Sequence, residues 1–248
     1  MSSIKKKWIL ITGAGSELAF NILKELNTKY NYILIGKNKK NFDKIKKNLK
    51  KLKFITITSD VCDENMHKKI ENISKIKKIK IYGAINFVGM HSFKPLKLIR
   101  YDNFEKIYKN NVFSFINLMK FFAINKKITT QKNSIINISS VSSLRGNKFI
   151  SLYSSSKAAA NNLSKSFAIE LSMEGVRVNS ILLGHYEKGL GKITKKFLNN
   201  NQLNLLKSQH LLGFGNINTL MGGINFLLEE KNDWITGAEI NIDGGFAA

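Results

Sequence analysis

The chain has 248 residues, of which 43% are hydrophobic and 23% are charged, with one cysteine and one proline. This mixture excludes collagen-like, coiled-coil and disordered proteins, and the length is enough to bury a sizeable core. A lone cysteine, Cys62, excludes a disulfide framework and a cysteine-based zinc site, which indicates a reducing, cytoplasmic setting. No apolar run approaches the roughly 20 residues that span a bilayer, and the basic N-terminus lacks a signal-peptide cleavage site, so we expect no membrane partner.

The net charge of +23 comes from 40 lysines and arginines against 17 acidic residues. Only Arg100, Arg145 and Arg177 are arginines, whereas proteins that contact phosphates and bases favour arginine for its bidentate fork. The lysines alternate with Ile, Leu and Asn at helical spacing, which is typical of solvated helix faces. We interpret the charge as surface composition and expect no nucleic-acid partner, while an acidic protein partner stays open.

No internal repeat or linker interrupts the chain, so we expect one domain over residues 1–248. Short runs rich in Ile and Val alternate with longer segments of helical period. In chain order the predicted elements are strand Trp8–Thr12, helix Glu17–Thr28, strand Tyr32–Gly36, helix Asn41–Lys50, strand Phe54–Thr58, helix Glu64–Ile76, strand Tyr82–Phe87, helix Tyr101–Asn125, strand Ser134–Ser139, helix Tyr153–Met173, strand Val176–Leu182, helix Asn216–Glu229 and strand Glu239–Ile242. This alternation predicts an α/β fold, a Rossmann-type doubly wound sheet of about seven parallel strands flanked by helices. Such sheets bind ligands at the carboxyl ends of their strands.

A glycine-containing turn follows the first predicted strand. Gly13 and Gly15 allow a tight turn whose backbone N–H groups approach a diphosphate, and the positive end of the next helix stabilises that anion. The pattern is not the usual G-x-G-x-x-G, because Glu17 places a carboxylate where a small residue is normal. We expect Glu17 to point away from the diphosphate.

The end of the second predicted strand bears on the choice of cofactor. An acidic residue at this place usually accepts hydrogen bonds from the ribose of NAD, but residues 36–40 contain none and include Lys37, Lys39 and Lys40. We therefore expect NADP(H) rather than NAD(H), with Lys37 near the 2′-phosphate. The alternative is that these lysines belong to the general lysine surplus.

A set of reactive side chains follows the fifth predicted strand. Ser140 ends that strand, and Tyr153 and Lys157 are four residues apart in the next helix, so that both project from one face. A tyrosine with a pKa near ~10 is a poor acid or base at neutral pH, and a neighbouring ammonium would lower that pKa. A serine hydroxyl can hydrogen-bond the substrate oxygen. Together these groups could protonate a carbonyl oxygen while a nicotinamide supplies hydride.

In combination these motifs resemble the short-chain dehydrogenase/reductase family along nearly the whole chain, and most closely its 3-oxoacyl carrier-protein reductase branch. The residues that carry the resemblance are Thr12 to Ala19 (the family's T-G-x-x-x-G-x-G), Asp60-Val61, Asn86 to Gly89 (N-N-A-G), Asn111, Ser140, Tyr153 with Lys157, Val176 to Asn179, Gly184, Trp234 to Gly237 and Asp243 to Gly245. The segment Asn86 to Gly89 keeps only the first asparagine and the glycine of its motif, and Leu183 replaces a proline before Gly184. The departures that matter most are Glu17 and Ala19, which replace glycines, and Lys188, which replaces a threonine that contacts the carboxamide.

The resemblance implies a role for each matched residue. Tyr153 would be the general acid/base, Lys157 would lower its pKa and bind the nicotinamide ribose, Ser140 would polarise the carbonyl, and Asn111 would hold a relay water. The implied cofactor-binding residues are Gly13, Gly15, Ser16, Leu18, Lys37, Asp60, Val61, Asn86, Gly89, Tyr153, Lys157 and Gly184. The family also forms dimers through its fourth and fifth helices and tetramers through its closing segment, so a homodimer or homotetramer is expected.

Residues 185–210 are expected to form a helical lid that sets specificity over the substrate. The four histidines lack metal-ligand spacing, so we expect no metal site. His91 and His185 border the expected active-site mouth, although an ordinary loop role is the favoured interpretation for both. The leading functional hypothesis is interconversion of a ketone, small or carrier-bound, and a secondary alcohol. The alternatives are a sugar- or polysaccharide-pathway reductase of the same family and a non-catalytic binding protein that keeps the fold.

Overall fold

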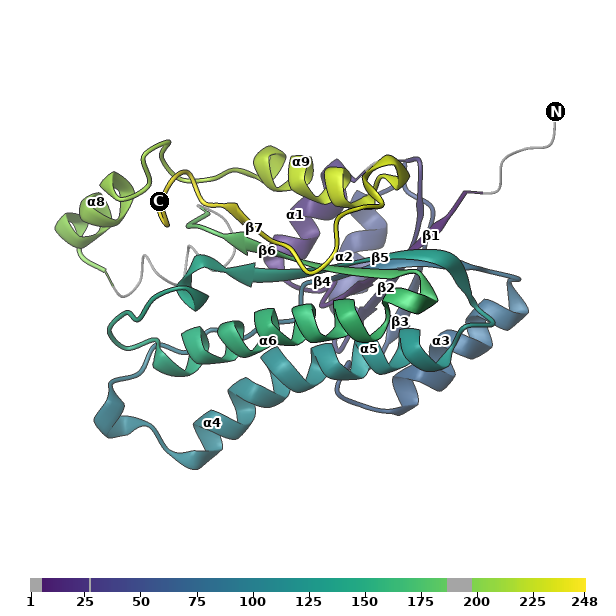
Figure 1. The fold of residues 1–248 in the computed structure, drawn as a ribbon, viewed down its shortest axis with the longest axis horizontal. Helices are drawn as coiled ribbons and strands as arrows, with labels where there is room; N and C mark the ends of the chain where they lie inside the picture. The colour runs from purple at the N-terminus through teal and green to yellow at the C-terminus, as the bar shows by residue number, and fades with distance from the viewer. Residues whose placement is uncertain (1–5, 27, 187–197) are drawn as a thin grey trace.

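The alternation of apolar runs and amphipathic segments produces a layered α/β structure (Figure 1). The computed structural model describes residues 6–26, 28–186 and 198–248. Within these residues the strands are β1 (Trp8–Thr12), β2 (Asn31–Gly36), β3 (Phe54–Thr58), β4 (Ile81–Asn86), β5 (Thr129–Ser140), β6 (Val176–Leu183) and β7 (Glu239–Ile242). The α-helices described there are α1 (Glu17–Glu25), α2 (Lys39–Asn48), α3 (Asn65–Ile76), α4 (Tyr101–Tyr108), α5 (Ser114–Ile124), α6 (Ser151–Glu170), α8 (Asn200–Ser208) and α9 (Ile217–Leu228).

The seven described strands form one parallel sheet in the order β3-β2-β1-β4-β5-β6-β7. The chain builds one half outward from β1 and then crosses to β4 to build the other half. The crevice between the carboxyl ends of β1 and β4 is therefore the topological switch point, where such sheets bind ligands. The predicted fold class, a Rossmann-type doubly wound sheet of about seven parallel strands, is confirmed.

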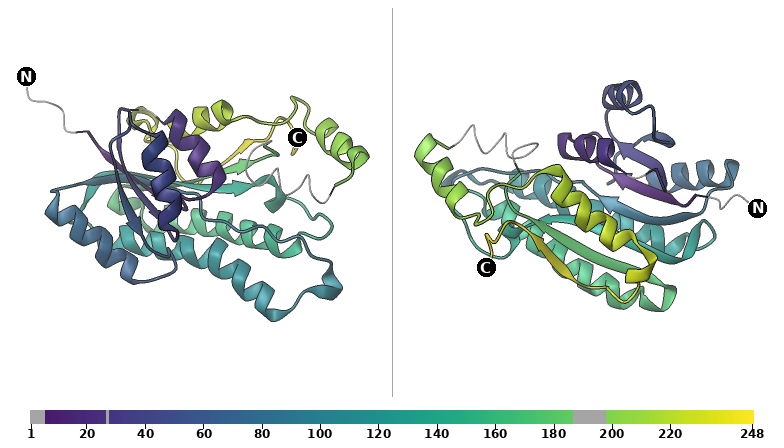
Figure 2. Two further views of the ribbon diagram at one scale, coloured as in Figure 1. Left: turned by 180° about the vertical axis from the view of Figure 1, so that it is seen from behind. Right: turned by 90° about the horizontal axis from the view of Figure 1, so that it is seen from above.

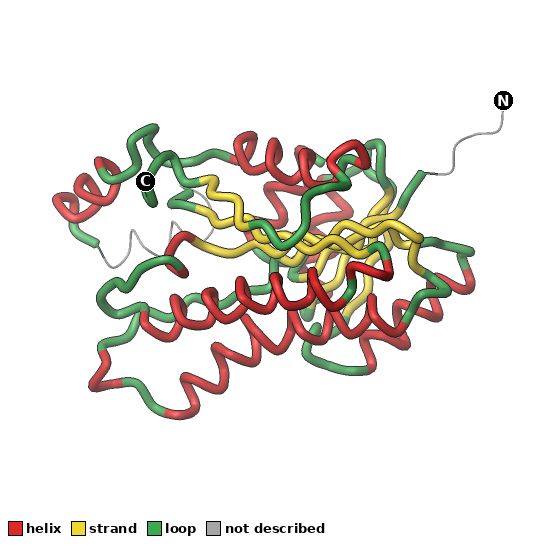
Figure 3. The backbone as a smooth tube through the Cα atoms, in the orientation of Figure 1, coloured by secondary structure: helices red, strands yellow, loops and turns green. Residues whose placement is uncertain are grey.

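Helices cover both faces of the sheet, which Figure 3 draws as a band between two helical layers. Helices α1, α2 and α9 lie on one face and α3 to α6 on the other (Figures 1 and 2). Side chains alternate between the two faces along each strand, so that Ile9 and Ile11 join the first core, whereas Trp8 and Leu10 join the second. This two-sided burial is why the strands are apolar at successive positions.

A chain of buried hydrogen bonds crosses the sheet from β1 to α6. Thr12 Oγ1 donates to Asn86 Oδ1 at 2.7 Å, and Asn86 Nδ2 donates to Asn137 Oδ1 at 3.0 Å. Asn137 Nδ2 donates to Ser180 Oγ at 3.5 Å, and the hydroxyls of Ser180 and Ser164 lie 2.9 Å apart. All five side chains are buried, so each depends on its neighbours for a hydrogen-bond partner.

Element bounds differ from the predicted ones by a few residues, and the largest differences are in β5 and in the helix predicted over Tyr101–Asn125. Strand β5 begins at Thr129, five residues before the predicted start. The helix predicted over Tyr101–Asn125 is divided by a π-helical segment, Lys109–Phe113, between α4 and α5. Of the predicted lid, residues 187–197, with Lys188 among them, lie outside the described residues, while α8 lies within its second half. No helix in the described part of the chain is both long enough and apolar enough to cross a membrane.

Candidate active site

Helix α6 presents Tyr153 and Lys157 toward the carboxyl end of β5. The spacing of four residues places both on the buried face of the helix, and each side chain is only 5% exposed. The Lys157 Nζ donates a hydrogen bond of 2.9 Å to the carbonyl oxygen of Ile138 in β5. This bond fixes the ammonium two residues before the strand ends.

Ser140 is the last residue of β5 and lies beside Tyr153. Its Oγ accepts a hydrogen bond of 3.1 Å from the backbone N–H of Ser142, in the 3₁₀ turn that follows the strand. The Ser140 side chain is also close enough to Tyr153 to act on its ionisation, because it favours a lower pKa of the phenol. The sequence-predicted serine, tyrosine and lysine are thus brought together at one edge of the sheet.

Burial governs the ionisation of both helix residues. Desolvation lowers the pKa of Lys157 from 10.5 to about 8, which brings this amine close to the neutral range. Desolvation also raises the pKa of Tyr153, and the Ser140 side chain opposes that rise only in part. The net shift of the Tyr153 pKa is therefore upward. The physical reason is that the burial that brings the pair together disfavours the phenolate.

Asn111 lies in the π-helical segment and joins the loop after β4 to α6. Its Oδ1 accepts from the backbone N–H of Met90 at 2.6 Å. Its Nδ2 donates to the Met90 carbonyl at 3.0 Å and to Ser156 Oγ at 2.8 Å. A widened turn of this kind is common at functional sites, because it turns a side chain out of the regular helical pattern.

Gly89 completes this group because it leaves room for the lysine. A Cβ at Gly89 would lie 3.2 Å from Lys157 Nζ and 4.0 Å from Asn111 Oδ1. Asn86, at the end of β4, is 1% exposed, and its amide is engaged in the buried chain described above. The structure therefore brings Gly89, Asn111 and Lys157 together and places Asn86 beneath them.

The glycine turn after β1 is built around a close approach to β4. Gly13 has φ +67°, and a Cβ there would lie 2.8 Å from the backbone carbon of Phe87, so only glycine fits without a shift. Ser16 begins α1 as its N-cap by accepting from the N–H of Ala19 at 3.2 Å. Gly15 lies against Asn41, whose Nδ2 donates to the Gly15 carbonyl at 2.9 Å.

This turn fits a dinucleotide, because it leads at the switch point into the N-terminus of α1, where the helix dipole favours an anion. Leu18 is partly buried, and the two departures from the family pattern are accommodated: Glu17 is exposed on the first turn of α1, and Ala19 is fully buried in the core.

Lys37 and Asp60 meet across the ends of β2 and β3. The Lys37 Nζ lies 2.9 Å from Asp60 Oδ2, and Asp60 Oδ1 accepts from the N–H of Cys62 at 2.9 Å. Partial burial acts to raise the pKa of Asp60, but the bonds from Cys62 and Lys37 outweigh it, and this pKa falls below its ordinary value. Val61, which lies between Asp60 and Cys62 in the sequence, is buried.

Gly184 follows β6 and abuts the C-terminal segment, since a Cβ there would lie 2.7 Å from Asp243 Cα. This residue is on the same edge of the sheet but outside the Ser140, Tyr153 and Lys157 cluster. No group of three or more His, Cys, Asp or Glu side chains is placed to hold a metal ion anywhere in the described ranges.

The sequence interpretation gave too little weight to several neighbours of the site. The ring of His91 lies 4.5 Å from the ring of Tyr153, and burial lowers the pKa of this histidine. No motif identifies the groups that bond to predicted site residues: Asn41 bonds to Gly15, Ser156 to Asn111 and the Ile138 carbonyl to Lys157. Position after a strand end was the one usable signal for His91.

Comparison with known proteins agrees with this geometry. The sequence matches the short chain dehydrogenase family over residues 7–196. A 3-oxoacyl-(acyl-carrier-protein) reductase FabG of Buchnera aphidicola subsp. Schizaphis graminum is 28% identical over 243 residues, covering 98% of each chain. An L-xylulose reductase of Caenorhabditis elegans is 24% identical over 245 residues, covering 97% of this chain and 96% of its own.

A solved structure of ElxO with NADP bound superposes with a TM-score of 0.84 at 25% identity, covering 98% of this chain and 99% of that one. The family match spans most of the chain and includes the glycine turn, Asn111, Ser140 and the Tyr153 and Lys157 pair. The chain belongs to the short chain dehydrogenase family of oxidoreductases.

Proposed function

We propose that this protein interconverts a ketone and a secondary alcohol with NADP(H), using Ser140, Tyr153, Lys157 and Asn111. The observation that carries the proposal is the buried cluster at the end of β5. There Ser140 at the end of the strand lies beside Tyr153, and a lysine with a pKa of about 8 lies one helical turn away, where its ammonium donates to the Ile138 carbonyl. When bound, the nicotinamide supplies or accepts a hydride.

The four side chains divide the proton chemistry among them. Tyr153 holds its proton because burial raises its pKa, so its hydroxyl donates to a carbonyl oxygen that gains negative charge. Ser140, held by the Ser142 N–H, donates a second hydrogen bond to the same oxygen. Lys157 provides positive charge that stabilises the resulting phenolate, and Asn111 fixes the loop and helix around that ammonium.

The remaining predicted cofactor contacts belong to the same proposal. Gly13, Gly15, Ser16 and Leu18 would hold the diphosphate, and Asp60 with Val61 would flank the adenine. The residues after β4 and β6, Asn86, Gly89 and Gly184, would flank the nicotinamide half. NADP(H) is favoured over NAD(H) by Lys37 and by the NADP-bound structure of ElxO. The Lys37 ammonium already neutralises Asp60, so it would serve both a carboxylate and a 2′-phosphate.

For the substrate we propose a 3-oxoacyl thioester, free or on an acidic carrier protein, as acted on by the FabG relative. A net charge of +23 favours an acidic partner. The second candidate is a sugar reductase, and the L-xylulose reductase match favours it. We further propose that the chain works in the cytoplasm as one domain, forms a homodimer or homotetramer, and uses residues 185–210 as a lid.

The test is a titration of the purified protein with NADPH and then NADH, followed by nicotinamide fluorescence, and then turnover of acetoacetyl-coenzyme A and L-xylulose. We expect tight NADPH binding and oxidation of NADPH by the thioester. Tyr153→Phe should keep NADPH binding and lose at least about 100-fold in kcat, because the proton donor is gone. Full activity of Tyr153→Phe would show that another group is the acid. Binding of neither cofactor would favour a non-catalytic role.

A further inference from the structure

A third polar residue lies on the face of α6 that carries the tyrosine and lysine. Asn161 follows Lys157 by four residues and Tyr153 by eight, and it is 3% exposed. The adjacent Asn162 is exposed. One asparagine of the pair is therefore buried against the sheet, in line with the two reactive side chains.

The amide of Asn161 reaches the turn that carries Ser140. Asn161 Nδ2 donates to Ser143 Oγ at 2.9 Å, and the Ser143 hydroxyl donates in turn to the carbonyl oxygen of Ser140 at 2.7 Å. Ser143 ends the 3₁₀ turn Val141–Ser143, whose Ser142 N–H orients the Ser140 hydroxyl. Helix α6 and the serine turn are thus connected by two consecutive hydrogen bonds.

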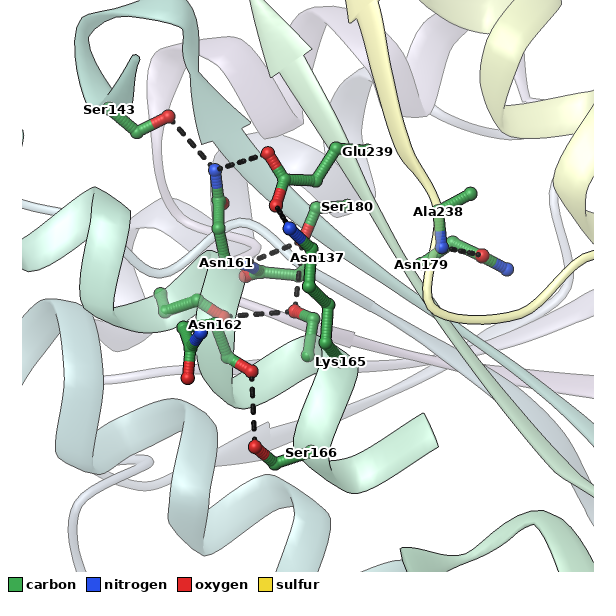
Figure 4. A network of polar contacts seen from close by, with 12 residues as sticks. Asn137, Ser143, Asn161, Asn162, Lys165, Ser166, Asn179, Ser180, Ala238 and Glu239 are labelled. Carbon is green, nitrogen blue, oxygen red and sulfur yellow. Dashed lines mark hydrogen bonds and ion pairs between the residues drawn. The ribbon is translucent and has the colours of Figure 1, made fainter. Parts of the chain in front are cut away.

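A carboxylate holds the same amide from the opposite side. Figure 4 shows Asn161 between Ser143 and Glu239, with Glu239 also joined to Lys165. Asn161 Nδ2 lies 3.5 Å from Glu239 Oε2, and Glu239 Oε1 lies 2.5 Å from Lys165 Nζ. The amide nitrogen therefore has two acceptors within reach, one on β7 and one on the serine turn.

The burial of this amide is energetically unfavourable in one respect. Asn161 Oδ1 is buried and makes no hydrogen bond to any described residue. A buried acceptor without a partner destabilises the folded state, and a leucine of similar size would avoid that cost. Helix packing alone does not account for an asparagine here, whereas its two amide contacts do.

We infer that Asn161 is a positioning residue for the proposed reaction, acting through Ser143 to hold Ser140 in register with Tyr153. The inference rests on the proposed function, because it assigns Ser140 and Tyr153 to one carbonyl oxygen. These two hydroxyls come from different elements, the end of β5 and helix α6. Their separation depends on how the turn is held to the helix, and that link is the Asn161 amide.

The experiment compares kcat, KM for the ketone and the NADPH dissociation constant in matched variants. Asn161→Leu keeps the bulk and removes the amide, and Asn162→Leu is its control on the exposed side of the same helix. Ser143→Ala removes the other partner, and Ser143→Thr keeps the hydroxyl. The double variant Asn161→Leu/Ser143→Ala tests whether the two residues act through one contact.

Asn161→Leu and Ser143→Ala should each lower kcat about tenfold, because a small displacement of an oriented group is enough to slow the reaction. The NADPH dissociation constant should stay unchanged, the double variant should be no slower than either single one, and Ser143→Thr should restore kcat. Asn162→Leu should match the wild type. Wild-type kcat in Asn161→Leu, equal losses in cofactor binding, or additive losses in the double variant would overturn the inference.

Amide exchange of the turn supplies a measurement that needs no turnover. In Asn161→Leu the exchange of the Ser142 and Leu144 amides should be about tenfold faster, because the turn loses its link to α6. Unchanged exchange would overturn the inference even if the enzyme slowed. A wild-type protein that reduces no ketone would instead remove the proposed function, while the exchange data would still decide whether Asn161 holds the turn.

Discussion

The amine of Lys157 is buried, and burial disfavours its charged form. The protonation of Lys157 therefore differs between the folded and the unfolded protein. Its pKa is about 8 in the folded protein and 10.5 when unperturbed. Below pH 8 both states hold the proton, so the folded state bears the full desolvation penalty. Between these two pH values the unfolded chain keeps the proton longer, and stability rises with pH.

Lys157→Met should therefore stabilise the protein at pH 7. The relieved penalty is about 3 kcal/mol and the lost bond to Ile138 about 1 kcal/mol, so we expect a net gain of about 2 kcal/mol. The gain should shrink or reverse at pH 10, where the folded wild type has already lost the proton. Urea unfolding at both pH values checks this, and an equal loss of stability at both would contradict it. NADPH oxidation by the same variant should be abolished.

The placement of Tyr153 and Lys157 side by side was predictable because the information is local. Tyr153 and Lys157 are four residues apart, and this interval alone places them on one helix face. The pairing of Lys37 with Asp60 was not predictable, because it joins residues 23 positions apart through the packing of two strand ends. The pKa of Tyr153 was not predictable either, since it depends on how deeply the helix is buried rather than on which residue is near.

At the scale of elements, the turn after β1 depends on one glycine. Gly13→Ala would force a side chain into φ +67° and place its Cβ 2.8 Å from the backbone of Phe87. A non-glycine residue in this region costs on the order of 1–3 kcal/mol, and the contact with backbone adds to that. We expect a loss of a few kcal/mol by urea unfolding, together with weaker NADPH binding.

Gly146→Ala is the matched control, because a Cβ at Gly146 meets nothing within 4 Å. Its unfolding free energy should change by less than about 1 kcal/mol, with NADPH binding intact. Equal behaviour of the two variants would show that the approach of β1 to β4 does not constrain residue 13.

The strands and helices could be predicted where the spacing of hydrophobic residues along the sequence is that of a strand or a helix. The polar segment at the start of β5, Thr129 to Asn133, predicts a loop, yet Ile81 pairs with Thr129 and Val176 pairs with Asn133. Neighbouring strands thus extend β5 beyond its apolar part. The π-helical segment could not be predicted either, because one widened turn changes the helical spacing of apolar residues very little.

At the scale of the whole molecule, several apolar side chains on or next to α5 and α6 are exposed. Phe113, Ile124, Ile169 and Met173 are 42%, 66%, 77% and 96% exposed. Exposed apolar side chains on neighbouring helices become buried when two copies of a chain associate through those helices. We expect sedimentation velocity to show a dimer or tetramer at micromolar concentration. Ile169→Lys should shift the distribution toward monomer, whereas a wild-type monomer at every concentration would contradict the assembly.

The buried hydrogen bonds from Thr12 to Ser164 also bear on how the chain finds its fold. Sliding one strand by a single residue turns its side chains to the opposite faces. For β5 the slip would move the Asn137 amide away from both Asn86 and Ser180. Each buried polar group left without a partner in this way costs roughly 1–3 kcal/mol of stability. Misaligned sheets of this sequence are thus penalised once helices cover both faces, and the same asparagine that interrupts an apolar strand favours the correct alignment.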